Sequence, residues 1–106
     1  MPKYLFEAKY TPEGVRGLKE AGASSRAKAV NDMATGLGGS IDSFHFAFGD
    51  VDAYVVVDLP DDEVAAAAAF TVGASAATQV KTVKLLTLEE ADAAIERAVA
   101  YRPPGS

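Results

Sequence analysis

Apolar and polar positions alternate along the first ten residues of the chain. Tyr4, Phe6 and Ala8 occupy every second position, and charged or aliphatic side chains stand between them. A period of two residues indicates a β-strand, because successive side chains of a strand point to opposite faces. We therefore predict a strand over residues 3–10.

Helical spacing follows this strand. Thr11 and Pro12 are typical of a helix start, since the hydroxyl caps free amides and proline fits the first helical position. Glycines keep this first helix short. A longer helix is expected to begin at Ser24 or Ser25 and to end at Gly38-Gly39, where glycine suits a left-handed cap. Its apolar stripe consists of Ala27, Val30, Ala34 and Leu37.

A hairpin is predicted in the middle of the chain. Strands over residues 40–48 and 51–59 are separated only by Gly49-Asp50, which favours a type II′ turn. Counting back from a two-residue turn fixes which residues lie opposite each other. The expected pairs are Phe48–Val51, Ala47–Asp52, Phe46–Ala53, His45–Tyr54, Phe44–Val55, Ser43–Val56, Asp42–Val57 and Ile41–Asp58.

The second half of the chain predicts a helix, a strand and a further helix. An alanine-rich helix over residues 64–72 has acidic side chains before its first turn and Phe70 as its only large anchor. Residues 78–86 form the fourth predicted strand. Thr87 and Glu90 form a capping box, which indicates a last helix. The apolar face of that helix consists of Leu88, Ala91, Ile95 and Val99.

The predicted order is strand, helix, strand, strand, helix, strand and an extra C-terminal helix. This is the order of the split βαβ or ferredoxin-like fold, an α+β class in which the main helices cover one face of an antiparallel sheet. Because domains of about 100 residues fold as one unit, we expect a single domain over residues 1–100 and a loose tail over residues 101–106.

The two faces of the predicted sheet differ in polarity. The face beneath the helices collects apolar side chains, among them Phe44, Phe46 and Phe48. The other face is half apolar, and such a face invites a partner. We therefore expect a symmetric homodimer, a dimeric α+β barrel, whose two sheets pack through these faces and enclose a cavity. The mixed face consists of Lys3, Leu5, Glu7, Lys9, Ile41, Ser43, His45, Ala47, Asp52, Tyr54, Val56 and Asp58.

Composition limits the chemistry. The 106 residues include no cysteine and one histidine, which excludes a disulfide scaffold, a thiol nucleophile and a zinc site of several imidazoles. The net charge of −5 makes nucleic acid an unexpected partner. No apolar run reaches the roughly 20 residues of a membrane span and no export signal is present, so we expect a cytoplasmic protein without a membrane partner. No metal site and no cofactor motif is predicted.

Three segments resemble the GYD domain family: the opening KYLFEAKYTPEGVRGL, the Gly38-Gly39 helix exit and FGDVDAYVVVDLPDDE. The family is named for a Gly-x-Tyr-Asp element at this hairpin. Here Gly49 and Asp52 match the element, and Val51 stands at the tyrosine position. The resemblance covers most of residues 3–90 and implies a dimeric α+β barrel. It implies little about activity, because similar barrels include monooxygenases, isomerases, haem-degrading enzymes and ligand-binding modules.

Two residues of the mixed face are candidates for catalysis. Histidine side chains titrate near neutral pH, so His45 is the candidate general base. The alternative is a histidine that fills space and donates a hydrogen bond to Tyr54 or makes a dimer contact. Asp52 is the candidate that orients His45 or binds a substrate amine. Alternatively, its carboxylate accepts backbone amides beside the turn.

Four further residues are candidate ligand contacts. Tyr54 either donates to a ligand oxygen or packs across the strands. Glu7 is unusual in a central strand, and the alternative role is an ion pair with a neighbouring lysine. Ser43 and Asp58 complete the predicted set.

These residues predict a small-molecule-binding protein with its cavity at the sheet-to-sheet dimer interface. Two alternatives stay open. In one, the cavity is the active site of a small enzyme in which His45 acts as general base. In the other, the dimer is a non-catalytic interaction or regulatory module.

Overall fold

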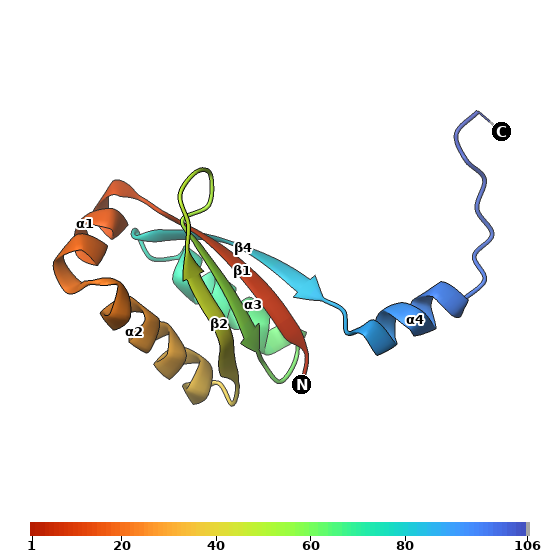
Figure 1. The fold of residues 1–106 in the computed structure, drawn as a ribbon, viewed down its shortest axis with the longest axis horizontal. Helices are drawn as coiled ribbons and strands as arrows, with labels where there is room; N and C mark the ends of the chain where they lie inside the picture. The colour runs from red at the N-terminus through yellow and green to blue at the C-terminus, as the bar shows by residue number, and fades with distance from the viewer. Residues whose placement is uncertain (106) are drawn as a thin grey trace.

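The structure of the chain, a computed structural model, describes residues 1–105 (Figure 1). The order of elements is the predicted one. Residues 101–105 of the predicted tail form no helix or strand, and Ser106 lies outside the described residues. The elements are β1 (Lys3–Tyr10), α1 (Pro12–Ala21), α2 (Ala23–Gly36), β2 (Ser40–Phe46), β3 (Ala53–Asp58), α3 (Asp62–Gly73), β4 (Thr78–Leu85) and α4 (Leu88–Glu96).

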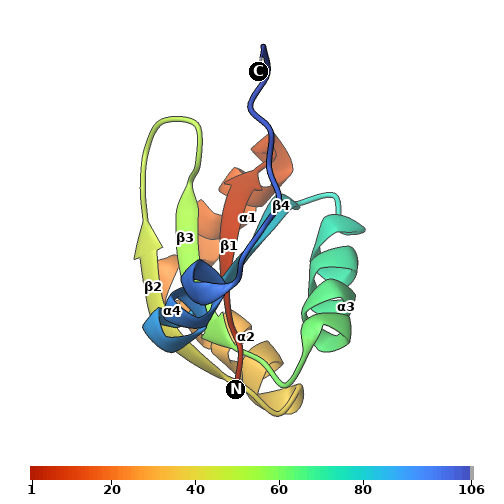
Figure 2. The same ribbon diagram turned by 90° about the vertical axis from the view of Figure 1, so that its right-hand side faces the viewer.

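The four strands form one antiparallel sheet in the order β2-β3-β1-β4, with β1 and β3 in the centre. α2 and α3 lie on the same side of this sheet (Figure 2). The predicted α+β, ferredoxin-like class is confirmed. The side of the sheet away from α2 and α3 is the open face.

The core lies between the sheet and the two helices. Tyr4 and Phe6 of β1 are only 2% and 7% exposed, and their neighbours along the strand point to the open face. Val30 and Ala34 of α2 are buried, as the predicted stripe requires. The full set of buried core residues is Tyr4, Phe6, Val30, Ala34, Val55, Val57, Leu59, Ala65 and Ala68.

A single glycine joins the first two helices. The N–H of Gly22 donates to Leu18 at 2.8 Å and ends α1, while its carbonyl accepts from Arg26 at 3.2 Å and starts α2. Its φ of 94° lies in the region that favours glycine. The predicted cap at Ser24 or Ser25 is therefore wrong, because both serines lie inside the first turn of α2.

The hairpin between β2 and β3 has a longer loop than predicted. The pairs His45–Tyr54 and Phe46–Ala53 are confirmed, as are the two pairs that precede them in β2. β2 ends at Phe46, however, so residues 47–52 form the loop. Phe48, expected beneath the helices, is 100% exposed in this loop.

A β-bulge at Asp42 shifts the register in the rest of the hairpin. Ile41 pairs with Val57 rather than with Asp58, so the last two predicted pairs are wrong. The extra residue in β2 moves Ile41 from the open face to the helix side, where it packs against the core. The bulge thus allows the apolar side chain of Ile41 to be partly buried, whereas an unbroken register would leave it on the open face.

Phe70 does not anchor α3 as predicted. Ala65 and Ala68 face the core, and Phe70 is 77% exposed. Two residues correspond to about 200° of helical rotation, so a residue two positions after Ala68 lies on the opposite side of the helix. α3 therefore packs through small side chains, which bring it close to the sheet.

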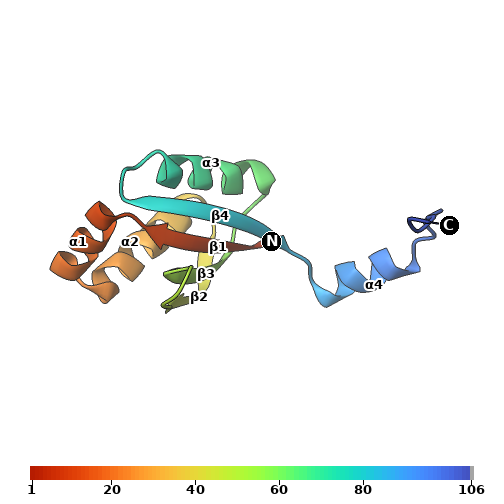
Figure 3. The same cartoon turned by 90° about the horizontal axis from the view of Figure 1, so that it is seen from above.

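α4 extends away from the body of the fold (Figures 1 and 3). The predicted capping box of Thr87 and Glu90 is present, but the helix ends at Glu96, before Val99. No residue of α4 is buried. The radius of gyration is 16.8 Å, whereas a compact chain of this length has about 13 Å.

Candidate functional site

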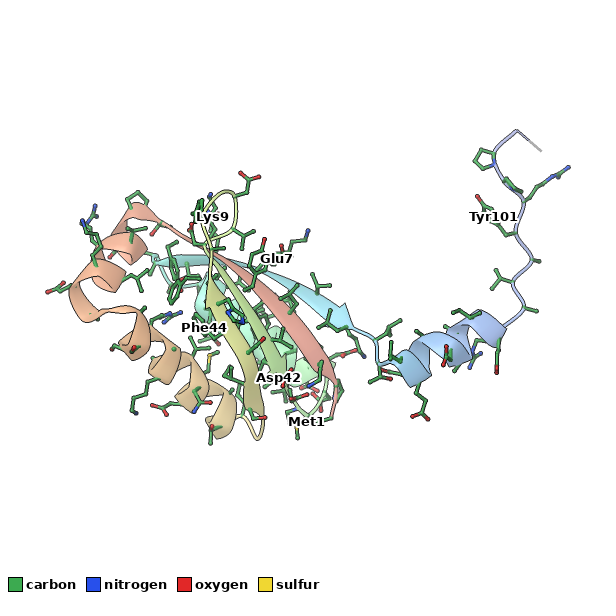
Figure 4. The ribbon with its side chains drawn as sticks, viewed as in Figure 1. Met1, Glu7, Lys9, Asp42, Phe44 and Tyr101 are labelled. Carbon is green, nitrogen blue, oxygen red and sulfur yellow. The ribbon has the colours of Figure 1, made fainter. Side chains whose placement is uncertain are left out.

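One row of polar side chains crosses the open face from edge to edge. His45 of β2 lies opposite Tyr54 of β3, and Tyr54 lies opposite Glu7 of β1. Glu7 in turn lies opposite Lys81 of β4. Figure 4 shows Glu7 on the side of the sheet away from α2, and Phe44 on the side toward α2. The structure thus brings three predicted site residues together in what we term the His45–Lys81 row.

The His45–Lys81 row is accessible in a single copy of the chain. His45 and Lys81 are exposed, Tyr54 is 39% exposed and Glu7 is half-buried. Within residues 1–105, no hydrogen bond or ion pair joins any two of these four side chains. An imidazole, a phenol, a carboxylate and an ammonium group therefore stand side by side without using one another as partners.

Lys81 is the member of this row that the sequence did not predict. The register of β4 against β1 cannot be counted from a turn, because a long stretch of chain separates the two strands. One signal was available. The ferredoxin-like topology places the fourth strand beside the first, and an acidic residue in a central strand favours a basic residue directly opposite.

Asp52 has its own contacts at the end of the loop. Its Oδ2 accepts the backbone N–H of Tyr10 at 2.8 Å, and its backbone N–H donates to Ala8 at 2.9 Å. No hydrogen bond joins Asp52 to His45 in the described part of the chain. The sequence suggested that Asp52 either orients His45 or binds a substrate amine, or else accepts backbone amides beside the turn. The contacts in the structure correspond to the second role.

Asp58 lies in an ion pair at the far end of the open face. Lys3 Nζ is 2.9 Å from Asp58 Oδ1 and 3.5 Å from Asp42 Oδ2. The hydrogen bond from Lys3 to Asp58 raises the pKa of the lysine above its ordinary value, against the opposing effect of desolvation. In a single copy of the chain, the carboxylate of Asp58 is therefore already paired with Lys3.

An apolar row separates this ion pair from the His45–Lys81 row. Ser43 lies opposite Val56, Val56 opposite Leu5, and Leu5 opposite Val83. All four are half-buried. Leu5, Val56 and Val83 therefore give the open face a strip of aliphatic surface directly beside its row of polar groups, with the hydroxyl of Ser43 at the β2 end of the strip.

A narrow apolar pocket lies on the other side of the sheet, between α2 and α3. Its cavity volume is about 30 Å³, and it is partly open to solvent. The pocket exists because the alanines of α3 leave space that larger side chains would fill. The sequence pattern does not predict it, because the pattern does not show how far apart the two helices lie. The pocket walls include Phe6, Val30, Phe44, Val55, Ala68 and Val72.

Arg26 is the charged residue in the wall of this pocket. Its guanidinium carbon lies 6.0 Å from the centre of the Tyr10 ring, at the outer limit of a cation–π contact. The Nε atom of Arg26 is buried and has no hydrogen-bond partner. A buried donor without a partner costs free energy.

Metal ligands are not grouped in the described residues. Within residues 1–105, no three His, Asp or Glu side chains lie close enough together to hold a metal ion. None of the helices described is long and apolar enough to cross a membrane.

Comparison with known proteins identifies the family. The family model for the GYD domain matches residues 4–95, which include all of the sheet except Lys3 and most of α4. No curated protein and no solved structure matches the chain. The matched range covers more than half of the chain and includes the Gly49–Asp52 element and the His45–Lys81 row. The chain therefore belongs to the GYD domain family.

Proposed function

We propose that this GYD-domain protein binds a small molecule as a homodimer whose two open faces meet. The observation that carries the proposal is the His45–Lys81 row, whose four polar side chains share an uncovered sheet face without hydrogen bonds to one another. The adjacent apolar row supports it, because aliphatic surface such as that of Leu5 and Val56 gains free energy when it is covered.

The His45–Lys81 row sets the chemistry of the ligand. Lys81 donates hydrogen bonds, Glu7 accepts them, and Tyr54 does both. The apolar row beside them suits a hydrocarbon portion. We therefore expect a small organic molecule with a polar, hydrogen-bonding group at one end and a short apolar part at the other.

Proton transfer is the reaction that the same row favours. His45 and Tyr54 lie directly opposite each other on neighbouring strands, so an imidazole and a phenol can reach the same ligand atom. In an enzyme of this kind, His45 is the general base and Tyr54 donates to the oxygen on which negative charge develops. A protein that binds the ligand without catalysing a reaction needs only the hydrogen bonds between the His45–Lys81 row and the ligand.

Two measurements test the proposal. Light scattering gives the mass in solution, and a dimer is expected at micromolar concentration. Ligand-detected NMR then screens polar metabolites against the wild-type protein. His45→Gln is expected to weaken binding of any hit about tenfold, because the hydrogen bond between the imidazole and the ligand is lost. Asn31→Gln, on the exposed side of α2, is the control and leaves binding unchanged.

The outcomes separate the functions that the sequence left open. A monomer at every concentration contradicts the dimer. A dimer for which His45→Gln binds each hit as well as the wild type contradicts the ligand site, and it favours a non-catalytic interaction module. Turnover of a hit that His45→Gln abolishes, while binding persists, identifies an enzyme.

A further inference from the structure

The C-terminal arm, residues 86–105, carries an amphipathic helix with nothing packed on its apolar side. Leu88, Ala91 and Ile95 follow each other in α4 at spacings of three and four residues, and Leu88 and Ile95 are 86% and 79% exposed. A stripe of this kind is normally buried in a folded protein. Leu86, Val99 and Tyr101 extend the exposed apolar surface at 61%, 78% and 73%.

The C-terminal arm does not fold back on its own sheet. Only Leu86 and Thr87 separate the end of β4 from the start of α4. Thr87 Oγ1 accepts from the Glu90 N–H at 3.0 Å, and Glu90 Oε1 accepts from the Thr87 N–H at 2.9 Å. These paired bonds fix the start and direction of the helix. α4 therefore continues beyond the end of the sheet, and Tyr101 lies farther out still (Figures 3 and 4).

α4 also lies on a particular side of the sheet. Figures 2 and 3 show it on the side of the open face, while α2 and α3 lie on the other side. A second copy placed against the open face would therefore lie beside α4. By twofold symmetry its own α4 would lie beside the first copy.

The size of the open face argues for a contribution from the C-terminal arm. The strand register gives the open face fourteen side chains, whereas a stable interface uses roughly 20–30 residues from each partner. The arm supplies further apolar residues at the edge of this face. The fourteen are Lys3, Leu5, Glu7, Lys9, Ser40, Ser43, His45, Tyr54, Val56, Asp58, Gln79, Lys81, Val83 and Leu85.

Charge favours the same partner. α4 carries the acidic residues Glu89, Glu90, Asp92 and Glu96. On the open face, Lys9 and Lys81 have no carboxylate within 4.0 Å among the described residues. An acidic helix and a sheet with unpaired lysines attract each other when they come from two copies.

We propose that the two copies exchange their C-terminal arms, so that the stripe of each α4 packs on the second copy at the border of its open face. This inference rests on the proposed pairing of open faces and adds a specific contact to it. The interface then consists of the two open faces with one α4 along each of two opposite borders.

A spin label detects this contact directly. The chain has no cysteine, so Ala93→Cys provides one attachment point, on the side of α4 away from the stripe. The labelled copy, at natural isotope abundance, is mixed with ¹⁵N-labelled wild type, and broadening of the ¹⁵N signals then reports only on contacts between copies. Broadening is expected for amides of the second copy at one border of its sheet, with recovery after the nitroxide is reduced.

Two matched variants measure what the contact contributes. Ile95→Glu places a charge in the stripe and is expected to weaken self-association at least about tenfold. Ala93→Glu adds the same charge on the other side of α4 and is expected to change it less than about threefold. Both are measured by analytical ultracentrifugation, with circular dichroism as the check on helix content.

The outcomes distinguish this inference from the proposal on which it rests. Dimers that show no broadening between copies, or that respond equally to the two variants, contradict the exchange of arms and leave the pairing of open faces intact. Wild-type monomers contradict both. Dimers with broadening at the sheet border and a selective effect of Ile95→Glu support both.

Discussion

The hydroxyl of Tyr4 donates a hydrogen bond to the carboxylate of Asp62, with 2.6 Å between the oxygens. Tyr4 is buried in the central strand β1, and Asp62 begins α3. Lys84 Nζ lies 2.9 Å from the same carboxylate oxygen. The bond therefore joins the centre of the sheet to the first turn of the helix that packs on it, and the lysine of β4 holds the carboxylate in place.

Tyr4→Phe is expected to destabilise the protein by about 1 kcal/mol. The substitution keeps the ring in the core and removes only the hydroxyl, so the loss is that of one hydrogen bond. Urea unfolding followed by circular dichroism measures the difference. Tyr101→Phe, at a position 73% exposed, is the control and should not change the midpoint. A variant at position 4 as stable as the wild type would show that the bond contributes nothing.

Alkaline pH is expected to weaken the fold through the same tyrosine. Burial, and then the hydrogen bond to Asp62, raises the pKa of Tyr4 to about 12 from an ordinary value of 10.0. A raised folded-state pKa contributes stability that is fully present below pH 10 and is lost as the pH rises toward 12. Urea midpoints measured across this range should fall faster for the wild type than for Tyr4→Phe. Parallel curves would contradict the assignment.

The hairpin shows what the sequence could predict and where local counting failed. The pairs His45–Tyr54 and Phe46–Ala53 follow from a symmetric turn, and a longer symmetric loop preserves them. The bulge at Asp42 adds one residue to β2, and no periodic pattern reveals a single insertion. A signal was nevertheless present, since an unbroken register placed apolar Ile41 opposite Asp58.

The candidate site likewise has features that the sequence could predict and features that it could not. Alternation, together with the count back from the turn, put His45, Tyr54 and Glu7 on one face, because side chains along a strand alternate between the two faces with a period of two. The contact between Asp52 and the Tyr10 amide depends on how the loop meets the end of β1, and sequence spacing does not fix that approach. The exposure of Phe70 follows from which side of α3 faces the sheet, and in an alanine-rich helix little in the pattern marks that side.

The start of α3 depends on Asp61. Its Oδ1 accepts the N–H of Val64 at 2.9 Å and satisfies one of the free amides of the first turn. Asp61→Ala is expected to cost about 1 kcal/mol of stability in thermal or urea unfolding. Asp50→Ala, an exposed aspartate in the hairpin loop, is the matched control. If the two variants unfold alike, the cap is not a determinant of stability.

Two glycines of α1 are expected to respond in opposite directions to the same substitution. A Cβ on Gly14 would overlap the carbonyl oxygen of Ala77, the residue that precedes β4, whereas a Cβ on Gly17 meets nothing within 4 Å. Gly14→Ala must push α1 away from this carbonyl, which also accepts the Thr11 N–H at 3.0 Å. We expect a loss of about 2 kcal/mol or more.

Gly17→Ala should instead stabilise the protein by about 0.5–1 kcal/mol. Alanine in a helix interior loses less conformational entropy on folding than glycine, and this position gives the methyl group room. Urea midpoints of the two variants, measured beside the wild type, are expected to lie on opposite sides of it. Two midpoints displaced in the same direction would mean that helix propensity, rather than the close approach of α1 to Ala77, governs both sites.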